Sequence, residues 1–231
     1  GRRAGLARRI DLRAVAMELT DGFQADSAAL SRASEGLEGA SGRDLEAALR
    51  YVLTVDAPRY GLQTASEVAA QVAFRLAMGP DRRAIALIRR ALASIPAPPV
   101  RASFEEALQA AHGAGLTVVA THAVPRFLRT DAHRRLLRRC HVAVDAIGER
   151  TPLGTPAAYR RASELAKVHP RELVSVGDDP CAHVRAARRA GCQAILIWPA
   201  DDPRPPRAGQ LVTAPSLAEA LQALQSRHRG G

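Results

Sequence analysis

A chain of 231 residues, 47% of them hydrophobic, is long enough to bury one sizeable core, or a core domain with a smaller inserted one. It has no apolar run near the roughly 20 residues of a membrane span, and its N-terminal stretch lacks the apolar segment of a secretory signal. We therefore expect a soluble, cytoplasmic protein with no membrane partner. The three cysteines lack CxxC spacing, so they indicate neither a disulfide framework nor a zinc site.

The formal net charge of +10 comes almost wholly from arginine, because Lys167 is the only lysine. A basic surface attracts nucleic acid and other polyanions nonspecifically. The arginines are scattered along the chain, however, and aromatic residues make up only 3% of it, which supplies few stacking surfaces for single strands. Nucleic acid is therefore a possible partner that the composition does not favour.

The first half of the chain predicts one strand followed by helices. Residues 14–19, "AVAMEL", form a short apolar run typical of a strand, and the turn-prone "TDGF" follows. From residue 25 to about residue 95, apolar residues recur at helical spacing, as in "LEAALRYVL" and "RAIALIRRALASI". The segment "PAPPV" at 96–100 ends this block, because successive prolines cannot continue a helix.

After this linker, strands and helices alternate. Ser103 with Glu106 forms a capping box, and Thr155 with Pro156 opens a second helix. The expected strands are "LTVVA", "VAVDAI", "LVSVG", "AILIW" and "LVTA", with a last helix at "LAEALQAL". This alternation predicts a parallel sheet covered on both faces by helices.

Two aspartates, Asp178 and Asp179, follow the buried strand "LVSVG". They are good turn residues, because Asp caps helix starts and Pro180 suits the first helical position. They would also lie beyond the carboxyl end of a strand, where ligands bind in open α/β sheets, and two carboxylates there could hold Mg²⁺. Both interpretations remain open at this point.

The order and spacing of these segments resemble the haloacid dehalogenase-like (HAD) superfamily, in particular members whose helical cap is inserted just after the first strand. The segments that carry the resemblance are "GLTVVATHA", "GERTPLGTPAAYRRASELA" and "VSVGDDPCAHVRAARRAGCQAILI". It implies an α/β, HAD-like Rossmannoid fold with a parallel sheet flanked by helices and an all-helical cap. The implied core domain is residues 1–24 and 97–231, and the implied cap domain is residues 25–96.

The resemblance also assigns residues to roles. Asp178 takes the position of an acidic residue that helps bind Mg²⁺, and Thr121 that of a hydroxyl that contacts the transferred phosphoryl group. An ungapped alignment of "VAMELTDGF" puts Glu18 at the nucleophile and Thr20 at the general acid, where the family has aspartates. Glutamate moves the attacking oxygen by more than ~1 Å, which can cost about a hundredfold in rate. Threonine cannot protonate a leaving group as a carboxylic acid does.

One further position departs from the family pattern. Arg150 stands beside the position of a lysine that screens the nucleophile and phosphate, and could replace its charge. Glu18, Asp178 and Asp179 are the carboxylates available to a metal ion, which predicts a Mg²⁺ site that is weak or absent.

We therefore predict a catalytically degenerate HAD-like protein that acts as a binding, scaffold or regulatory subunit, with an unidentified protein or a small anionic ligand as its partner. One alternative is a divergent HAD-like hydrolase of the phosphatase type, acting on a small anionic substrate. A second is an RNA- or ribonucleoprotein-associated subunit whose arginine surface does the binding. Fold alone does not choose among them.

Overall fold

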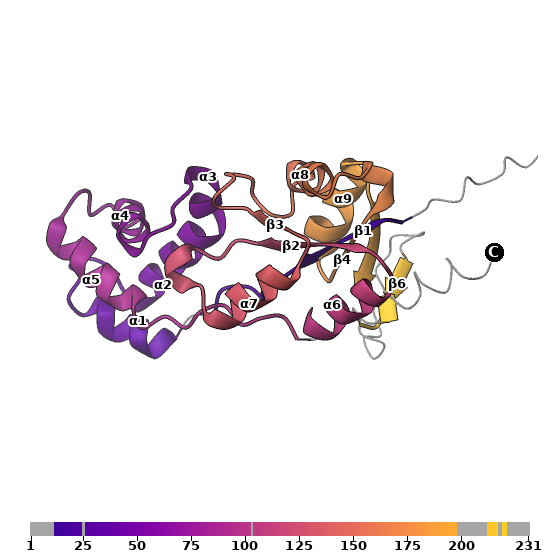
Figure 1. Cartoon of the computed structure of the whole chain (residues 1–231). Helices are drawn as coiled ribbons and strands as arrows, with labels where there is room; N and C mark the ends of the chain where they lie inside the picture. The colour runs from indigo at the N-terminus through magenta and orange to yellow at the C-terminus, as the bar shows by residue number, and fades with distance from the viewer. Residues whose placement is uncertain (1–11, 25, 103, 198–211, 217–218, 221–231) are drawn as a thin grey trace, which may run out of the picture.

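The computed structural model describes residues 12–24, 26–102, 104–197, 212–216 and 219–220. A sheet with helices on both faces forms one part of the molecule, and a group of helices lies at one end of it (Figure 1). The predicted cap residue Ser103 and most of the predicted last helix fall outside these ranges. Within them, no helix is long and apolar enough to cross a membrane.

The described residues form a six-stranded sheet of order β3-β2-β1-β4-β5-β6, in which every neighbouring pair is parallel. Its strands are β1 (Ala14–Glu18), β2 (Thr117–His122), β3 (Val142–Asp145), β4 (Leu173–Gly177), β5 (Gln193–Ile197) and β6 (Val212–Ala214). The predicted α/β class with a parallel sheet is confirmed. Because β1 lies between β2 and β4, the carboxyl ends of these three strands meet at one edge of the sheet.

The strands are apolar along their length because both faces of the sheet are covered. The covering helices are α6 (Phe104–Gly113), α7 (Asp131–Arg139), α8 (Pro156–Ala166) and α9 (Ala186–Arg189), with short helical turns η2 (Arg126–Leu128), η3 (Pro170–Glu172) and η4 (Pro180–Arg185). Val15 and Met17 pack with residues of α6 and α7, whereas Ala14 and Ala16 pack with residues of α8 and α9. The same alternation directs Glu18 to the side of α8 and α9.

The segment between β1 and β2 is helical. Its elements are α1 (Ser27–Ser34), α2 (Gly42–Tyr51), η1 (Val52–Asp56), α3 (Ala57–Tyr60), α4 (Ala65–Arg75) and α5 (Arg82–Leu92). We call residues 26–96 the helical block; none of them lies in a strand of the sheet. The block forms most of an apolar cluster in which Leu45, Leu49 and Ile88 are fully buried, and Val124 and Leu128, which follow β2, complete it. The exact domain boundary at residues 25 and 96 stays a prediction.

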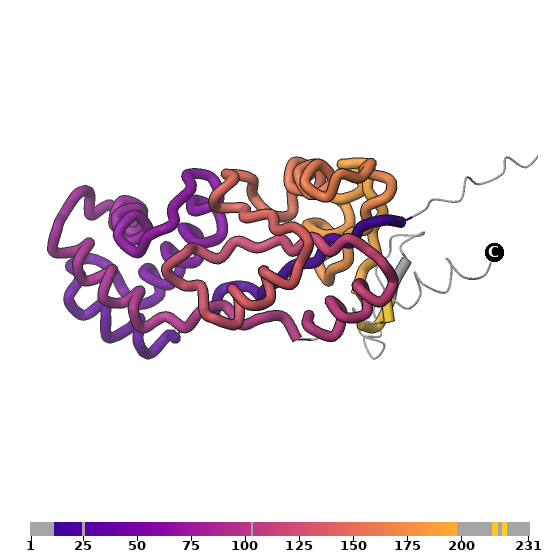
Figure 2. The backbone as a smooth tube through the Cα atoms, in the orientation of Figure 1, coloured from indigo at the N-terminus to yellow at the C-terminus, as the bar shows by residue number. Residues whose placement is uncertain are grey.

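The chain enters and leaves the helical block through two segments that pair with each other. Thr20, just after β1, forms an antiparallel bridge with Val100 on the return segment. The backbone N–H of Arg101 donates to the carbonyl of Leu19 at 2.9 Å. Figure 2 follows the chain from β1 into the block and back to the sheet. This pairing fixes Arg101 beside the carboxyl end of β1.

Because the apolar cluster centred on the helical block is distinct from the two clusters that cover the sheet, we predict that the block can unfold separately. We expect Leu49→Ala to lower the free energy of unfolding by about 2–5 kcal/mol, the usual cost of a cavity at a buried leucine. Hydrogen exchange should then accelerate in α1–α5 and stay slow in β1, β2 and β4. Leu108→Ala, at an equally buried position on α6, is the matched control and should act on the sheet. Equal acceleration in both parts by Leu49→Ala would mean that they unfold as one unit.

Candidate functional site

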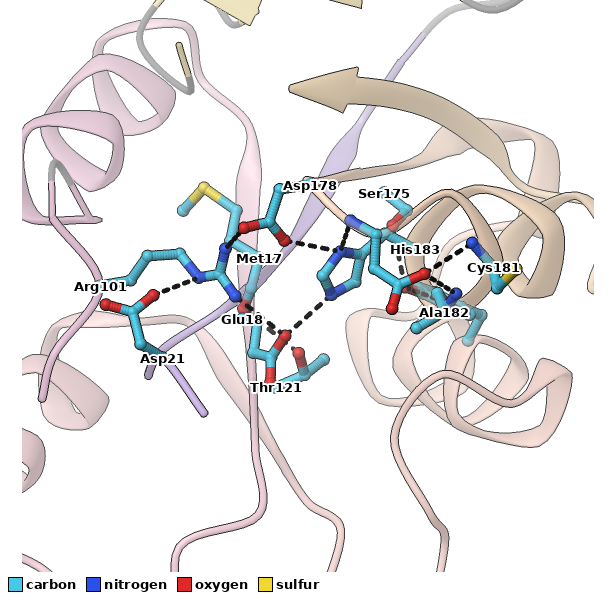
Figure 3. A network of polar contacts seen from close by, with 12 residues as sticks. Met17, Glu18, Asp21, Arg101, Thr121, Ser175, Asp178, Cys181, Ala182 and His183 are labelled. Carbon is cyan, nitrogen blue, oxygen red and sulfur yellow. Dashed lines mark hydrogen bonds and ion pairs between the residues drawn. The ribbon is translucent and has the colours of Figure 1, made fainter. Parts of the chain in front are cut away.

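Three of the predicted site residues lie at one edge of the sheet (Figure 3). Glu18 ends β1, Thr121 lies directly opposite it on β2, and Asp178 follows the last residue of β4. The hydroxyl of Thr121 is nearly buried and donates a long hydrogen bond, 3.4 Å, to the carbonyl of Met17. The parallel topology therefore brings these three positions together, although they are far apart in the sequence.

A guanidinium group joins the carboxylates at this edge. Arg101 donates from Nη1 to Oδ2 of Asp178 at 2.7 Å and from Nη2 to Oε2 of Glu18 at 3.3 Å (Figure 3). Its Nε lies 3.7 Å from Oδ1 of Asp21. Only 16% of the Arg101 side chain is exposed, so these ion pairs are partly shielded from water. The site therefore holds a fixed internal cation.

Arg101 is absent from the residues predicted from the sequence. The available signal was its position, as the first basic residue after the proline-rich return segment. Recognising its role requires knowing that this segment pairs with the chain that leaves β1, through Val100 and Thr20.

An imidazole completes the network from the other side. His183, in η4, has Nε2 2.8 Å from Oε2 of Glu18 and Nδ1 3.4 Å from Oδ1 of Asp178. Burial of the ring disfavours its charge, but the hydrogen bonds to Asp178 and Glu18 outweigh burial and raise the pKa of His183 to about 9. The hydrogen bond with His183, and then the Arg101 charge, lower the pKa of Asp178 well below its usual range despite partial burial.

Nδ1 of His183 lies close to two groups that favour opposite protonation states of this nitrogen. The Asp178 carboxylate attracts a protonated nitrogen, whereas the backbone N–H of Asp179, 3.0 Å away, donates to an unprotonated one. With carboxylates near both ring nitrogens, we expect the charged ring at neutral pH. The contact with Asp179 then strengthens when the ring loses its proton.

Gly177 makes room for this ring. A Cβ atom built on Gly177 would lie 2.1 Å from Nδ1 of His183, far inside van der Waals contact. The last residue of β4 therefore has to be glycine for His183 to reach Glu18.

Asp179 is used differently from its neighbour Asp178. Its Oδ1 accepts the backbone N–H groups of Cys181 at 2.7 Å and Ala182 at 2.9 Å, and Pro180 takes the first helical position. The carboxylate of Asp179 thus caps η4. Of the two interpretations of the aspartate pair, the turn applies to Asp179 and the site position to Asp178.

Among the described residues, Thr20 and Arg150 do not belong to the network that contains Glu18 and Asp178. Thr20 is buried where the two connecting segments bridge. Arg150 has a positive φ of 51° and its side chain lies against Gly61 of the helical block, with Nε 3.2 Å from where a Cβ of Gly61 would be. The arginine that pairs with Glu18 is therefore Arg101, and not Arg150 as the sequence suggests.

The residues at this edge do not fit the Mg²⁺ ion that the resemblance implies. Mg²⁺ requires near-octahedral oxygen ligands at close range. Glu18 and Asp178 both already bind the guanidinium of Arg101, which would repel a second cation beside it. Across the part of the chain that is described, no group of three His, Cys, Asp or Glu side chains is arranged to hold a metal ion.

The raised pKa of His183 makes stability depend on pH. A folded-state pKa of about 9 against the ordinary histidine value of 6.5 means that the folded state holds this proton more tightly. The resulting stabilisation is fully present below about pH 6.5 and is lost as the pH rises through about 9, with an upper bound on the order of 3 kcal/mol. Urea unfolding at pH 7.5 and pH 9.5 measures most of it, because the lowered pKa values of His122 and His133 affect stability only at lower pH.

His183→Gln should flatten this pH dependence, because glutamine does not titrate. Gly177→Ala should flatten it as well, because the added methyl group displaces the ring without removing it. A wild-type stability that is constant across this window, or one whose slope survives in His183→Gln, would contradict the assignment.

Comparison with known proteins supports the HAD resemblance. The HAD-hydrolase-like family model matches residues 153–220, which include β4 and Asp178. No curated protein sequence matches the chain closely enough to count as a relative.

Solved structures match almost the whole chain. A 2-haloacid dehalogenase from Pseudomonas syringae pv. Tomato DC3000 has a TM-score of 0.62 and 19% identity, covering 93% of this chain and 99% of its own. An L-2-haloacid dehalogenase from Xanthobacter autotrophicus with chloropropionic acid covalently bound has a TM-score of 0.58 and 12% identity, covering 93% and 98%. A HAD phosphatase from Thermococcus onnurineus has a TM-score of 0.56 and 19% identity, covering 92% and 98%. The chain therefore has the HAD-like hydrolase fold.

Proposed function

We propose that this chain is a HAD-like protein without family-type catalysis, and that it works by binding, as a scaffold or regulatory subunit. The observation that carries the proposal is the guanidinium of Arg101, which is bonded to both Glu18 and Asp178. The two carboxylates on which the family's chemistry would depend here are paired with a cation that belongs to the chain itself.

The nucleophile position is the first weak point. A carboxylate nucleophile needs an oxygen with a free lone pair aimed at the substrate. Both contacts of the Glu18 carboxylate, with Arg101 and His183, are made by Oε2, and charge-assisted hydrogen bonds of this kind draw electron density from the whole carboxylate and so weaken it as a nucleophile. The extra methylene of glutamate adds the displacement already expected from the sequence.

The acid and metal positions are the second weak point. Thr20 is buried in the bridge with Val100 and carries no acidic proton for a leaving group. The positive charge that a metal ion would bring to a phosphate is supplied by Arg101, but that charge is already shared between Glu18 and Asp178. Because catalytic groups that act as a unit are strongly non-additive, losing the nucleophile alone should remove most of the rate.

A divergent hydrolase is the second candidate, and two observations favour it. The side chain of Glu18 is 23% exposed, so a small molecule can reach part of it. Two of the three similar structures named above are haloacid dehalogenases, one with chloropropionic acid covalently bound. In such a reaction the carboxylate of Glu18 would attack C2 of a 2-haloacid, halide would leave, and water would hydrolyse the resulting ester. Arg101 could then bind the substrate carboxylate.

One set of assays separates the two candidates. Wild-type protein, Glu18→Ala and Asp178→Ala are tested for phosphate release from p-nitrophenyl phosphate with Mg²⁺, and for halide release from 2-chloropropionate. An active HAD phosphatase is run in parallel as the positive control. We expect the wild type to stay at the level of Glu18→Ala with both substrates.

Two results would reject the loss of catalysis. Robust Mg²⁺-dependent phosphate release that disappears in Glu18→Ala or Asp178→Ala would show a working phosphatase. Halide release that disappears in Glu18→Ala would establish the divergent hydrolase.

A further inference from the structure

The edge of the sheet opposite the candidate site carries a group of basic side chains. His112 lies in the last turn of α6, Arg139 is the last residue of α7, and His141 directly precedes β3. Together with the turn at residues 115–117, which connects α6 to β2, they line a hollow of about 320 Å³. The hollow lies at the amino ends of the strands and shares no residue with the network at their carboxyl ends.

The hydrogen bond of His141 determines which of its ring nitrogens carries the proton. Nδ1 accepts the backbone N–H of Val118 at 3.0 Å, so this nitrogen offers a lone pair and has no hydrogen. The proton of the neutral ring is therefore on Nε2. A metal ion would need a lone pair on Nε2, whereas a hydrogen-bond acceptor needs the N–H that is present. His141 therefore suits a ligand that accepts hydrogen bonds.

Two further side chains with N–H groups adjoin this ring. The rings of His112 and His141 are nearly perpendicular, with their centres 5.0 Å apart. Partial burial first, and then the nearby His141 and Arg139, lower the pKa of His112. Arg139 donates from Nη1 to Glu105, and its other guanidinium nitrogens have no hydrogen bond among the described residues. An anion beside these groups would favour a proton on His112.

The position of these groups is not explained by the helix ends alone. Basic residues in the last turn of a helix interact favourably with its negative end, and this accounts for Arg138 on α7. It does not account for His141, which lies outside the helices and whose ring is fixed by β2. A second hollow adjoins the first along the turn at residues 115–117 and is lined by Arg13 and Lys167. Positive charge therefore continues along this edge of the sheet.

We propose that the hollow lined by His112, Arg139 and His141 binds a phosphate group, carried either by a small phosphorylated molecule or by a nucleic-acid backbone. A phosphate group offers three acceptor oxygens and up to two negative charges, whereas a carboxylate offers two oxygens and one charge. Three donor groups from three segments of the chain match the phosphate better, and a guanidinium is one of its preferred partners. This inference goes beyond the proposed function and does not depend on the loss of catalysis.

Titration of inorganic phosphate into the full chain, followed by the NMR signals of its seven histidine rings, tests the proposal. We expect saturable shifts of the His112 and His141 signals at millimolar or lower phosphate. His169 is the internal control, because it is exposed and its Nδ1 also accepts a backbone N–H, yet it does not line the hollow. Acetate at the same ionic strength should shift none of the three signals saturably.

Two variants locate the phosphate. Arg139→Gln should weaken its binding about tenfold, the loss expected for one charge-assisted hydrogen bond. Arg138→Gln is the matched control, because it removes the same charge from the neighbouring exposed position, which does not line the hollow, and it should change the affinity far less.

The proton on His112 gives the binding a pH dependence. The groups that act on this ring are His141 and Arg139, and a bound anion opposes their effect. Binding and protonation therefore favour each other. Sulfate keeps its charge between pH 7.5 and pH 5.5, so its affinity should rise as the pH falls over this range. The rise should be absent in His112→Gln, which does not titrate.

A short single-stranded oligonucleotide distinguishes the two sources of phosphate. Binding that is tighter than that of inorganic phosphate and is weakened by Arg139→Gln would assign the site to nucleic acid. Binding that is no tighter would assign it to a small phosphorylated molecule.

Three outcomes would overturn the proposal. The first is a set of shifts that do not saturate or that are as large at His169, which would indicate only a general attraction of anions to a basic chain. The second is saturable phosphate binding that Arg139→Gln leaves unchanged while circular dichroism shows the variant folded. The third is saturable binding of Zn²⁺ to both His112 and His141, which would contradict the proton placed on Nε2 of His141.

Discussion

The ion pairs of Arg101 with Glu18 and Asp178 determine what the carboxyl edge of this sheet can do. Without a cation between them, carboxylates at the ends of β1 and β4 would repel each other and would attract a metal ion. With Arg101 bonded at 2.7 Å to Asp178 and 3.3 Å to Glu18, that edge is largely neutralised from within. His183 adds a second positive group on the other side of Glu18. The network lies at the carboxyl ends of the strands, where open α/β sheets bind their ligands.

The network depends on two features of the backbone. The bridge between Thr20 and Val100 holds the return segment against the chain that leaves β1, and so fixes Arg101. Gly177 leaves space for the ring of His183 at the end of β4. A HAD-like topology thus accounts for where Glu18 and Asp178 lie, whereas local packing accounts for how they are neutralised.

Much of the fold could be predicted from the sequence, because apolar periodicity changes from helical to alternating strand and helix at "PAPPV". The neighbourhood of Glu18, Thr121 and Asp178 could also be predicted, since each lies at the carboxyl end of a strand in a sheet of recognisable order. Arg101 could not, because its role arises from a contact between two connecting segments. The different roles of Asp178 and Asp179 could not be predicted either, because they depend on which of the two carboxylates caps η4.

The role of Arg101 is tested most directly by titrating Mg²⁺ and Mn²⁺ into the wild type and Arg101→Met by calorimetry. If Arg101 takes the place of a metal ion, the wild type should show no saturable binding at millimolar concentrations. Arg101→Met should gain a site, because Glu18, Asp21 and Asp178 are then left without their shared counter-ion. That gain should disappear when Asp178→Asn is added. Tight binding of either metal to the wild type, abolished by Asp178→Asn, would contradict the account.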